Sequence, residues 1–138
     1  MRLDDSESPI SRGDLAPIER MYEAALPTAV TEFYLANNGG YPAGNRVRGD
    51  EFIFSINGFH PIKHGALPIE QLARDYLEST PSLAGMLPFA YDDGGNGFML
   101  SLRSHDRGHI YLWLHQEDRL MSVCRDFDTF LAGVYLDE

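Results

Sequence analysis

Alternating apolar and polar positions between residues 87 and 115 predict the centre of the fold. Apolar side chains occupy every second position in residues 98–102 and again in residues 110–114, which is the period of an extended strand. A shorter apolar run, residues 87–90, comes before them. Residues 91–97 contain three glycines and two aspartates, a composition that favours a turn. We therefore expect three consecutive antiparallel strands joined by two turns.

A period of three to four residues between apolar positions predicts two helices in the N-terminal third. The first begins near Asp14, its expected N-cap, and is interrupted by Pro27 because proline cannot donate a helical hydrogen bond. The second begins at residue 27 or 28 and stops at residues 38–40, where two glycines allow the left-handed conformation that ends many helices. Residues 41–50 have the composition of a loop.

The rest of the chain adds two strands and two helices. Alternation in residues 52–56 predicts a strand, and Pro68 opens a third helix with one apolar face. Residues 120–124 are a candidate strand, and a closing helix capped by Asp126 carries apolar residues as far as Tyr135. This order predicts an α+β fold, a mostly antiparallel sheet covered by helices from the N-terminal, middle and C-terminal segments.

The length of 138 residues suits one domain that closes its own hydrophobic core. We assign residues 14–138 to this domain and residues 1–13, which show no apolar periodicity, to a flexible N-terminal arm. The single cysteine, Cys124, cannot form an internal disulfide, and the polar N-terminus lacks the apolar core of a signal peptide. No apolar run approaches membrane-spanning length, so we expect a cytoplasmic protein without membrane contact.

The net charge of the chain favours some classes of binding partner over others. The chain has 11 basic and 21 acidic residues, which give a formal net charge of −10. This charge opposes direct binding to phosphate backbones and speeds association with a basic protein. The excess is strong late in the chain, where nine carboxylates and four arginines occur from Asp92 onward. We therefore expect a protein partner with a basic surface and no direct contact with nucleic acid.

Short motifs occur in a fixed order along most of the chain. They are Leu26-Pro27, Glu32-Phe33-Tyr34-Leu35, Asn38-Gly39-Gly40-Tyr41-Pro42, Leu87-Pro88-Phe89-Ala90, Asp92-Asp93-Gly94-Gly95-Asn96-Gly97-Phe98, Ile110-Tyr111-Leu112-Trp113 and Asp126-Phe127-Asp128-Thr129-Phe130-Leu131. In this order and spacing they resemble the SMI1/KNR4 family, also called the SUKH superfamily. The resemblance runs from about residue 18 to residue 135.

The resemblance implies a non-catalytic α+β domain that binds other proteins. In bacteria such a domain is commonly an immunity protein that neutralises a cognate polymorphic toxin, often a nuclease. An acidic binder suits a nuclease, which presents a basic surface to phosphates. Residues 46–83 carry little of the resemblance, so the choice of partner stays open. A scaffold or regulatory domain of the same family without a toxin partner is the alternative.

The candidate partner-binding residues come from the glycine-rich turn and from the end of the following hairpin. They are Asp92, Asp93, Asn96, Trp113, His115, Glu117 and Asp118. Trp113, His115 and Tyr111 share one strand face, opposite Leu112. If a helix covers that face these side chains are core, which we favour. Otherwise they form an aromatic surface that can grip a partner.

Metal-binding interpretations of the same residues are weaker than structural ones. The turn at residues 92–96 has carboxylate and amide oxygens suited to calcium, but not the ligand spacing of a helix-flanked calcium loop, and a hairpin turn explains its composition. The pairs His60/His64 and His105/His109 have a four-residue spacing, but the first spans Pro61 and precedes Gly65, and the second lies in a turn that contains Gly108. We therefore expect no metal ion and no cofactor.

One enzymatic alternative uses Cys124 as a nucleophile and His115 as its base, as in a small hydrolase. A lone cysteine in an apolar run is more often a small core residue. The chain also lacks the nucleophile elbow of a serine hydrolase, and its glycine-rich turn lacks the lysine of a phosphate loop. We therefore expect no enzyme.

Overall fold

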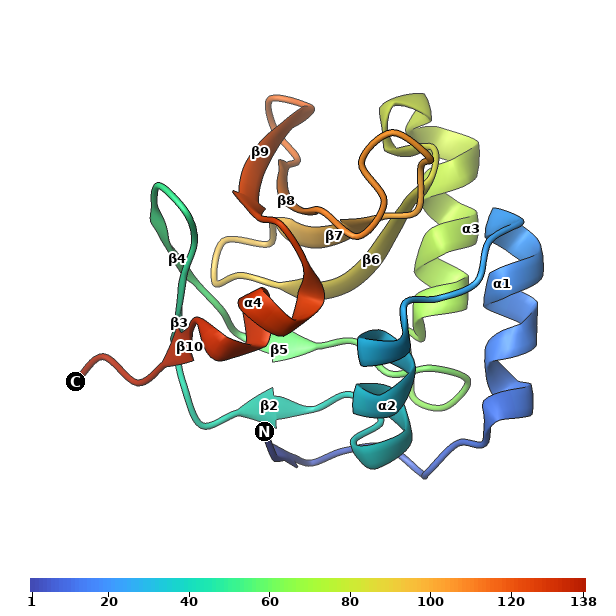
Figure 1. The fold of residues 1–138 in the computed structure, drawn as a ribbon, viewed down its shortest axis with the longest axis horizontal. Helices are drawn as coiled ribbons and strands as arrows, with labels where there is room; N and C mark the ends of the chain where they lie inside the picture. Colours follow the sequence, from blue (N-terminus) through green and yellow to red (C-terminus); the bar gives the residue numbers. More distant parts are fainter.

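The computed structural model describes residues 1–138, which form four α-helices and ten β-strands in antiparallel sheets (Figure 1). The predicted α+β class is confirmed. The largest sheet has five strands in the order β5-β6-β7-β8-β9, all antiparallel to their neighbours. These strands are β5 (Gly58–Phe59), β6 (Met86–Tyr91), β7 (Gly97–Ser101), β8 (Ile110–Leu114) and β9 (Arg119–Cys124). The three strands expected from the alternating pattern are β6, β7 and β8, and the candidate strand after them lies within β9.

Helices lie on both faces of this sheet. They are α1 (Ala16–Tyr22), α2 (Thr28–Ala36), α3 (Ile69–Ser79) and α4 (Phe127–Ala132), with short 3-10 helices η1 (Arg12–Leu15) and η2 (Pro81–Leu83). On one face, side chains such as Phe33, Phe98 and Phe130 belong to a core of 26 buried residues. On the other, Tyr76 of α3 packs against a cluster of four, Leu83, Met86, Met99 and Trp113. None of the helices combines the length and the apolar character that a membrane crossing requires.

A local signal in the sequence begins one helix as predicted. The Asp126 side chain accepts a hydrogen bond from the Thr129 backbone N–H at 2.8 Å, which caps α4. Helix α2 ends at Ala36, near the predicted stop, but its C-cap is Asn37 in an extended conformation with φ −143° and ψ 109°. Gly39 and Gly40, with φ of 74° and 120°, follow this residue and do not form the cap.

The start and the end of the first helix differ from the prediction. Ser11, not Asp14, is the N-cap, and it caps η1. Asp14 stands three residues later and accepts a hydrogen bond from the Ser11 N–H at 2.9 Å. At the other end, Glu23 adopts a left-handed φ of 52°, so α1 stops at Tyr22, before Pro27 can interrupt it.

A second sheet corrects two further predictions. It has the order β10-β3-β4, with β3 (Arg46–Arg48), β4 (Ile53–Ser55) and β10 (Val134–Tyr135). The segment 41–50, expected as a loop, thus contains β3 and also a second short strand, β2 (Tyr41–Pro42). Val134 and Tyr135, expected in the closing helix, instead pair with Val47 and Arg46. The chain leaves the helix at Gly133, where a Cβ atom would lie 2.6 Å from the Arg48 carbonyl oxygen.

The N-terminal segment packs along the domain. Strand β1 (Leu3–Asp4) pairs with β2 (Tyr41–Pro42), and the Leu3 and Ile10 side chains are 5% and 8% exposed. A flexible arm would not make these contacts, and no periodic pattern of apolar residues in the sequence predicts them. The mobility of residues 1–13 stays a prediction, and the burial of Leu3 and Ile10 argues against it.

Candidate functional site

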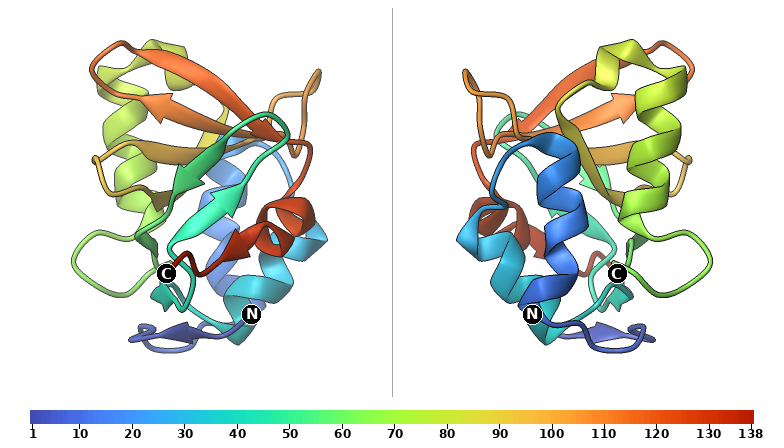
Figure 2. Two further views of the ribbon diagram at one scale, coloured as in Figure 1. Left: turned by 90° about the vertical axis from the view of Figure 1, so that its left-hand side faces the viewer. Right: turned by 90° about the vertical axis from the view of Figure 1, so that its right-hand side faces the viewer.

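The two turns that carry most of the predicted partner-binding residues lie at one end of the five-stranded sheet. Alternate connections of an antiparallel sheet fall at the same end, so the β6–β7 turn neighbours the β8–β9 turn. Both views of Figure 2 show these turns at the same edge of the molecule as the light green loop of residues 60–68. We call the carboxylates of these two turns, Asp92, Asp93, Glu117 and Asp118, the acidic edge.

Asp92 shapes the first turn and connects it to the second through Asn96. Its Oδ1 accepts hydrogen bonds from the N–H groups of Gly94 and Asn96 at 2.9 and 2.7 Å, and its Oδ2 accepts one from Asn96 Nδ2 at 3.0 Å. Asn96 Oδ1 then accepts from the His115 N–H at 3.2 Å and lies 2.8 Å from His115 Nδ1. Because that oxygen is an acceptor, Nδ1 carries the proton. Hydrogen bonds within the chain therefore account for the shape of this turn.

The carboxylates of Asp93 and Glu117 each make one contact with another side chain of the protein. Asp93 is exposed and accepts one hydrogen bond, from Asn57 Nδ2 at 3.2 Å. Glu117 is exposed and pairs with Arg119 at 3.2 Å. An ion pair at such an exposed position contributes little to stability, so Glu117 stays available to an external cation.

Trp113 belongs to the core, as favoured for its strand face, whereas Tyr111 on the same face is half-buried and His115 is exposed. The Trp113 side chain is 9% exposed, and its ring centre lies 5.4 Å from that of Tyr76 on α3. The indole N–H donates to Asp118 Oδ1 at 2.9 Å, and the Ser82 hydroxyl donates to the same oxygen at 2.6 Å. These hydrogen bonds, that of Ser82 first, lower the pKa of Asp118. Trp113 thus holds an acidic residue in place and offers little surface of its own.

The histidine pairs do not assemble metal sites. His60 packs its ring 4.9 Å from that of Tyr91, and His109 Nε2 lies 2.7 Å from the Ser122 hydroxyl. No group of three or more His, Cys, Asp or Glu side chains is placed to hold a metal ion. The imidazoles of His60 and His109 therefore contact neighbouring side chains of the fold, and neither belongs to a cluster that could bind a metal ion.

The suggested pair of Cys124 and His115 does not come together. Cys124 pairs with Ile110 at one end of β8, whereas His115 follows the other end of that strand. Five residues of strand separate the two positions by about 16 Å. Cys124 is also buried, and this burial raises the pKa of its thiol to about 11. The geometry excludes His115 as the base for this thiol.

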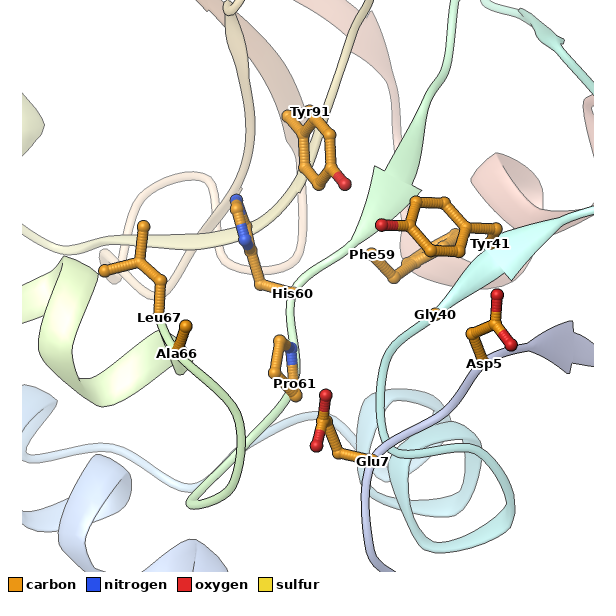
Figure 3. Close-up of a pocket in the computed structure, with 10 residues that line it drawn as sticks. All are labelled: Asp5, Glu7, Gly40, Tyr41, Phe59, His60, Pro61, Ala66, Leu67 and Tyr91. Carbon is orange, nitrogen blue, oxygen red and sulfur yellow. The ribbon is translucent and has the colours of Figure 1, made fainter.

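A pocket beside the acidic edge is the main feature that the sequence did not reveal (Figure 3). Its volume is about 370 Å³, near the lower end of the range for ligand pockets. It is lined by Asp5, Glu7, Gly40, Tyr41, Phe59, His60, Pro61, Ala66, Leu67 and Tyr91. These residues come from the N-terminal segment, β2, β5, the loop after β5 and the end of β6. Tyr91 directly precedes Asp92, so the pocket adjoins the acidic edge.

Two buried side chains hold the pocket loop in place. Asn38 is 3% exposed. Its Oδ1 accepts from the Ile62 N–H at 2.7 Å, and its Nδ2 donates to the Ile62 carbonyl at 2.9 Å. Asn38 Nδ2 also donates to the Ser8 carbonyl at 2.9 Å, which ties the N-terminal segment to the loop. The second buried side chain is Tyr34, whose hydroxyl donates to the His60 carbonyl at 2.9 Å. The pocket is therefore built on fixed backbone on two sides.

The electrostatics of the pocket are set by burial and by its rim. Burial lowers the pKa of His60 to about 4, so its imidazole is neutral at pH 7. Burial is also the largest cause that raises the pKa of Tyr91, followed by the Tyr41 hydroxyl. Asp5 and Glu7 contribute the only formal charges of the lining. Within this group the sequence singles out Gly40 and Tyr41 as part of a motif and His60 as one of a histidine pair. Nothing local links them to residues 5 and 7.

Comparison with models of protein families gives a match over most of the chain. The family model described as SMI1 / KNR4 family (SUKH-1) matches residues 9–133 of the chain. The match includes both turns of the acidic edge and all of the pocket lining except Asp5 and Glu7. No curated protein matches the sequence.

Proposed function

The chain belongs to the SMI1/KNR4 family (SUKH-1), and from this premise we propose that it is a non-catalytic bacterial immunity protein that binds and neutralises a cognate polymorphic toxin. The family match over residues 9–133 is the observation that carries this proposal. The family fits an immunity-type binding module. The acidic charge of the chain and the burial of its only cysteine support that role. We place its action in the cytoplasm, where the free, buried Cys124 needs no oxidising environment.

The distribution of charge supports a basic partner. The formal net charge is −10, and Asp93, Glu117 and Asp118 are exposed next to each other at one end of the sheet. A negative surface of this kind raises the rate at which a basic protein is captured, and salt weakens the effect. A nuclease toxin has such a basic surface because it must bind phosphates. The toxin in this proposal is therefore a nuclease.

The chemistry of the best nucleophile candidate supports binding without catalysis. With a pKa of about 11, the Cys124 thiol is almost entirely protonated at pH 7, and a thiol is a poor nucleophile compared with its thiolate. Its side chain donates to the Asp126 carbonyl at 3.5 Å. Cys124 therefore fills a core position below the cap of α4.

The test is co-expression with the toxin encoded beside the gene for this chain. The chain is expected to restore growth of cells that express the toxin and to co-elute with it in size-exclusion chromatography. Failure of both rescue and complex formation contradicts the immunity role. A neighbourhood without any toxin gene, with a different protein captured, supports the regulatory or scaffold alternative.

A matched pair of variants links the rescue to the acidic edge. Asp93→Asn with Glu117→Gln removes two charges from this edge. Glu51→Gln with Asp128→Asn removes two exposed charges from the turn between β3 and β4 and from α4, outside the two turns of the acidic edge. Both variants have a net charge of −8. Slower association with the toxin in the first variant alone supports the acidic edge, and equal rates contradict it.

A further inference from the structure

We propose that the pocket beside the acidic edge receives an arginine side chain of the partner protein. This inference rests on the proposed protein-binding function and specifies the chemistry of the contact. The aromatic walls, the acidic rim, the neutral imidazole and the position of the pocket each support an extended basic side chain as the occupant.

The walls provide faces on which a guanidinium group can stack. Tyr41 is 47% exposed, and the rings of Tyr91 and His60 pack against each other with centres 4.9 Å apart. Arginine stacks on aromatic faces through its planar, delocalised cation, and tyrosine is a favourable partner. Leu67 is 43% exposed at the other end of the pocket, where Figure 3 shows it beside Ala66. This apolar end suits the methylene stem of the same side chain.

The rim provides negative charge without a cation of its own. No hydrogen bond or ion pair within the chain involves the carboxylate of Asp5 or of Glu7. Lys63, on the pocket loop, is engaged elsewhere, because its ammonium group lies 3.0 Å from Asp14 Oδ1. An incoming guanidinium therefore meets two available carboxylates, and a carboxylate can bind the planar group through two parallel hydrogen bonds.

The imidazole of His60 is compatible with a cation. Burial keeps it neutral at pH 7, so it adds no repulsion, and one ring nitrogen is free to accept a hydrogen bond from the guanidinium. A protonated imidazole on the same wall would oppose an arginine. The pocket therefore selects for positive charge at neutral pH and offers few donors to an anionic ligand.

The position of the pocket matches a protein partner. Tyr91 is followed directly by Asp92 and Asp93, so the pocket adjoins the first turn of the acidic edge. A volume of about 370 Å³ with exposed walls accommodates one long side chain and the backbone next to it. A partner drawn in by the acidic edge would thus place an arginine in the pocket, where a buried hot-spot contact contributes most of the affinity.

The site is tested directly with N-acetyl-arginine amide, followed by two-dimensional NMR of the isotope-labelled full chain. We expect saturable shifts of the Tyr41, His60 and Tyr91 signals at about 1–20 mM, because a single side chain binds weakly. N-acetyl-citrulline amide, which has the same shape without the charge, should cause no such shifts. Equal shifts with both probes, or shifts confined to other surfaces, overturn the proposal.

Variants show whether the pocket itself binds the probe. Asp5→Asn with Glu7→Gln should abolish the shifts. Asparagine tolerates the φ of 56° at position 5, so the backbone is preserved. Tyr41→Leu, a change at an exposed ring, should weaken the shifts at least about fivefold through lost stacking. The control Glu51→Gln with Asp128→Asn should titrate like the wild type. Unchanged binding by the first variant overturns the proposal.

The toxin complex separates failure of the site from failure of the proposed function. If the chain binds the toxin, Asp5→Asn with Glu7→Gln should weaken that complex at least about tenfold relative to the charge-matched control. Full toxin affinity in this variant overturns the arginine site while the immunity function stands. If the chain neither rescues cells nor binds the toxin, but the pocket still binds N-acetyl-arginine amide, the arginine site is supported and the immunity function is contradicted.

Discussion

Replacement of Asn38 by alanine is expected to destabilise the fold by about 3 kcal/mol and to loosen the pocket loop. The side chain is 3% exposed and makes three hydrogen bonds, two with the backbone of Ile62 and one with the Ser8 carbonyl. Each such bond contributes about 1 kcal/mol, and a buried partner left unpaired adds to the loss. Alanine provides neither the donor nor the acceptor. Aspartate keeps only the acceptor and turns a second oxygen toward the two carbonyls.

Urea unfolding followed by the fluorescence of the single tryptophan, Trp113, measures the change in the free energy of unfolding. Hydrogen exchange measures local opening at the Ile62 amide, which should exchange faster in Asn38→Ala. The control is Asn57→Ala, which removes an exposed asparagine with one hydrogen bond, to Asp93. That change should cost about 1 kcal/mol or less. A loss below about 1 kcal/mol in Asn38→Ala, with unchanged Ile62 exchange, refutes this reasoning.

Four further changes test the core, the cap and two titrating groups. Phe130→Ala should cost about 3–5 kcal/mol in urea unfolding, because the ring is fully buried among other aromatic rings. Asp126→Ala should cost about 1 kcal/mol through loss of the α4 cap, and Asp126→Ser should recover most of it. Cys124 should react with iodoacetamide far more slowly in the folded chain than in urea, because a pKa raised from 9.0 to about 11 leaves about 100-fold less thiolate at pH 7. The pKa of His60 is about 4 in the folded chain and 6.5 in the unfolded chain, so the unfolded chain binds a proton first as the pH falls. The free energy of unfolding should therefore decrease between pH 6.5 and pH 4. Urea midpoints over this range should fall less in His60→Gln than in the wild type.

The elements that the sequence predicts correctly are those whose cause is local. Alternating side chains identify β6, β7 and β8, and the Asp126 cap acts on backbone three residues away. The acidic edge itself was not predicted, and the role of its residues in binding stays a prediction, but its geometry follows from the order of the strands. Two turns that alternate along an antiparallel sheet must share an end, so Asn96 and His115 meet as the order of the strands requires.

The elements that escape prediction depend on partners distant in the chain. Strand β10 forms because Val134 pairs with Val47, and a helical period in residues 127–135 gives no sign of that pairing. The pocket shows the same limit, since Glu7 and Tyr91 lie 84 positions apart and carry no shared motif. The Asn38 amide, which holds both sides of the pocket together, was visible only as part of a helix stop.

Hydrogen exchange of the complex between this chain and its toxin identifies the surface that the partner covers. We expect slower exchange in the pocket loop, residues 60–67, and in the two turns at residues 92–96 and 115–118. The turn of the β3–β4 hairpin, residues 49–52, should exchange at the same rate as in the free chain. Protection of that hairpin or of α1, with the pocket loop and both turns unchanged, would contradict the account.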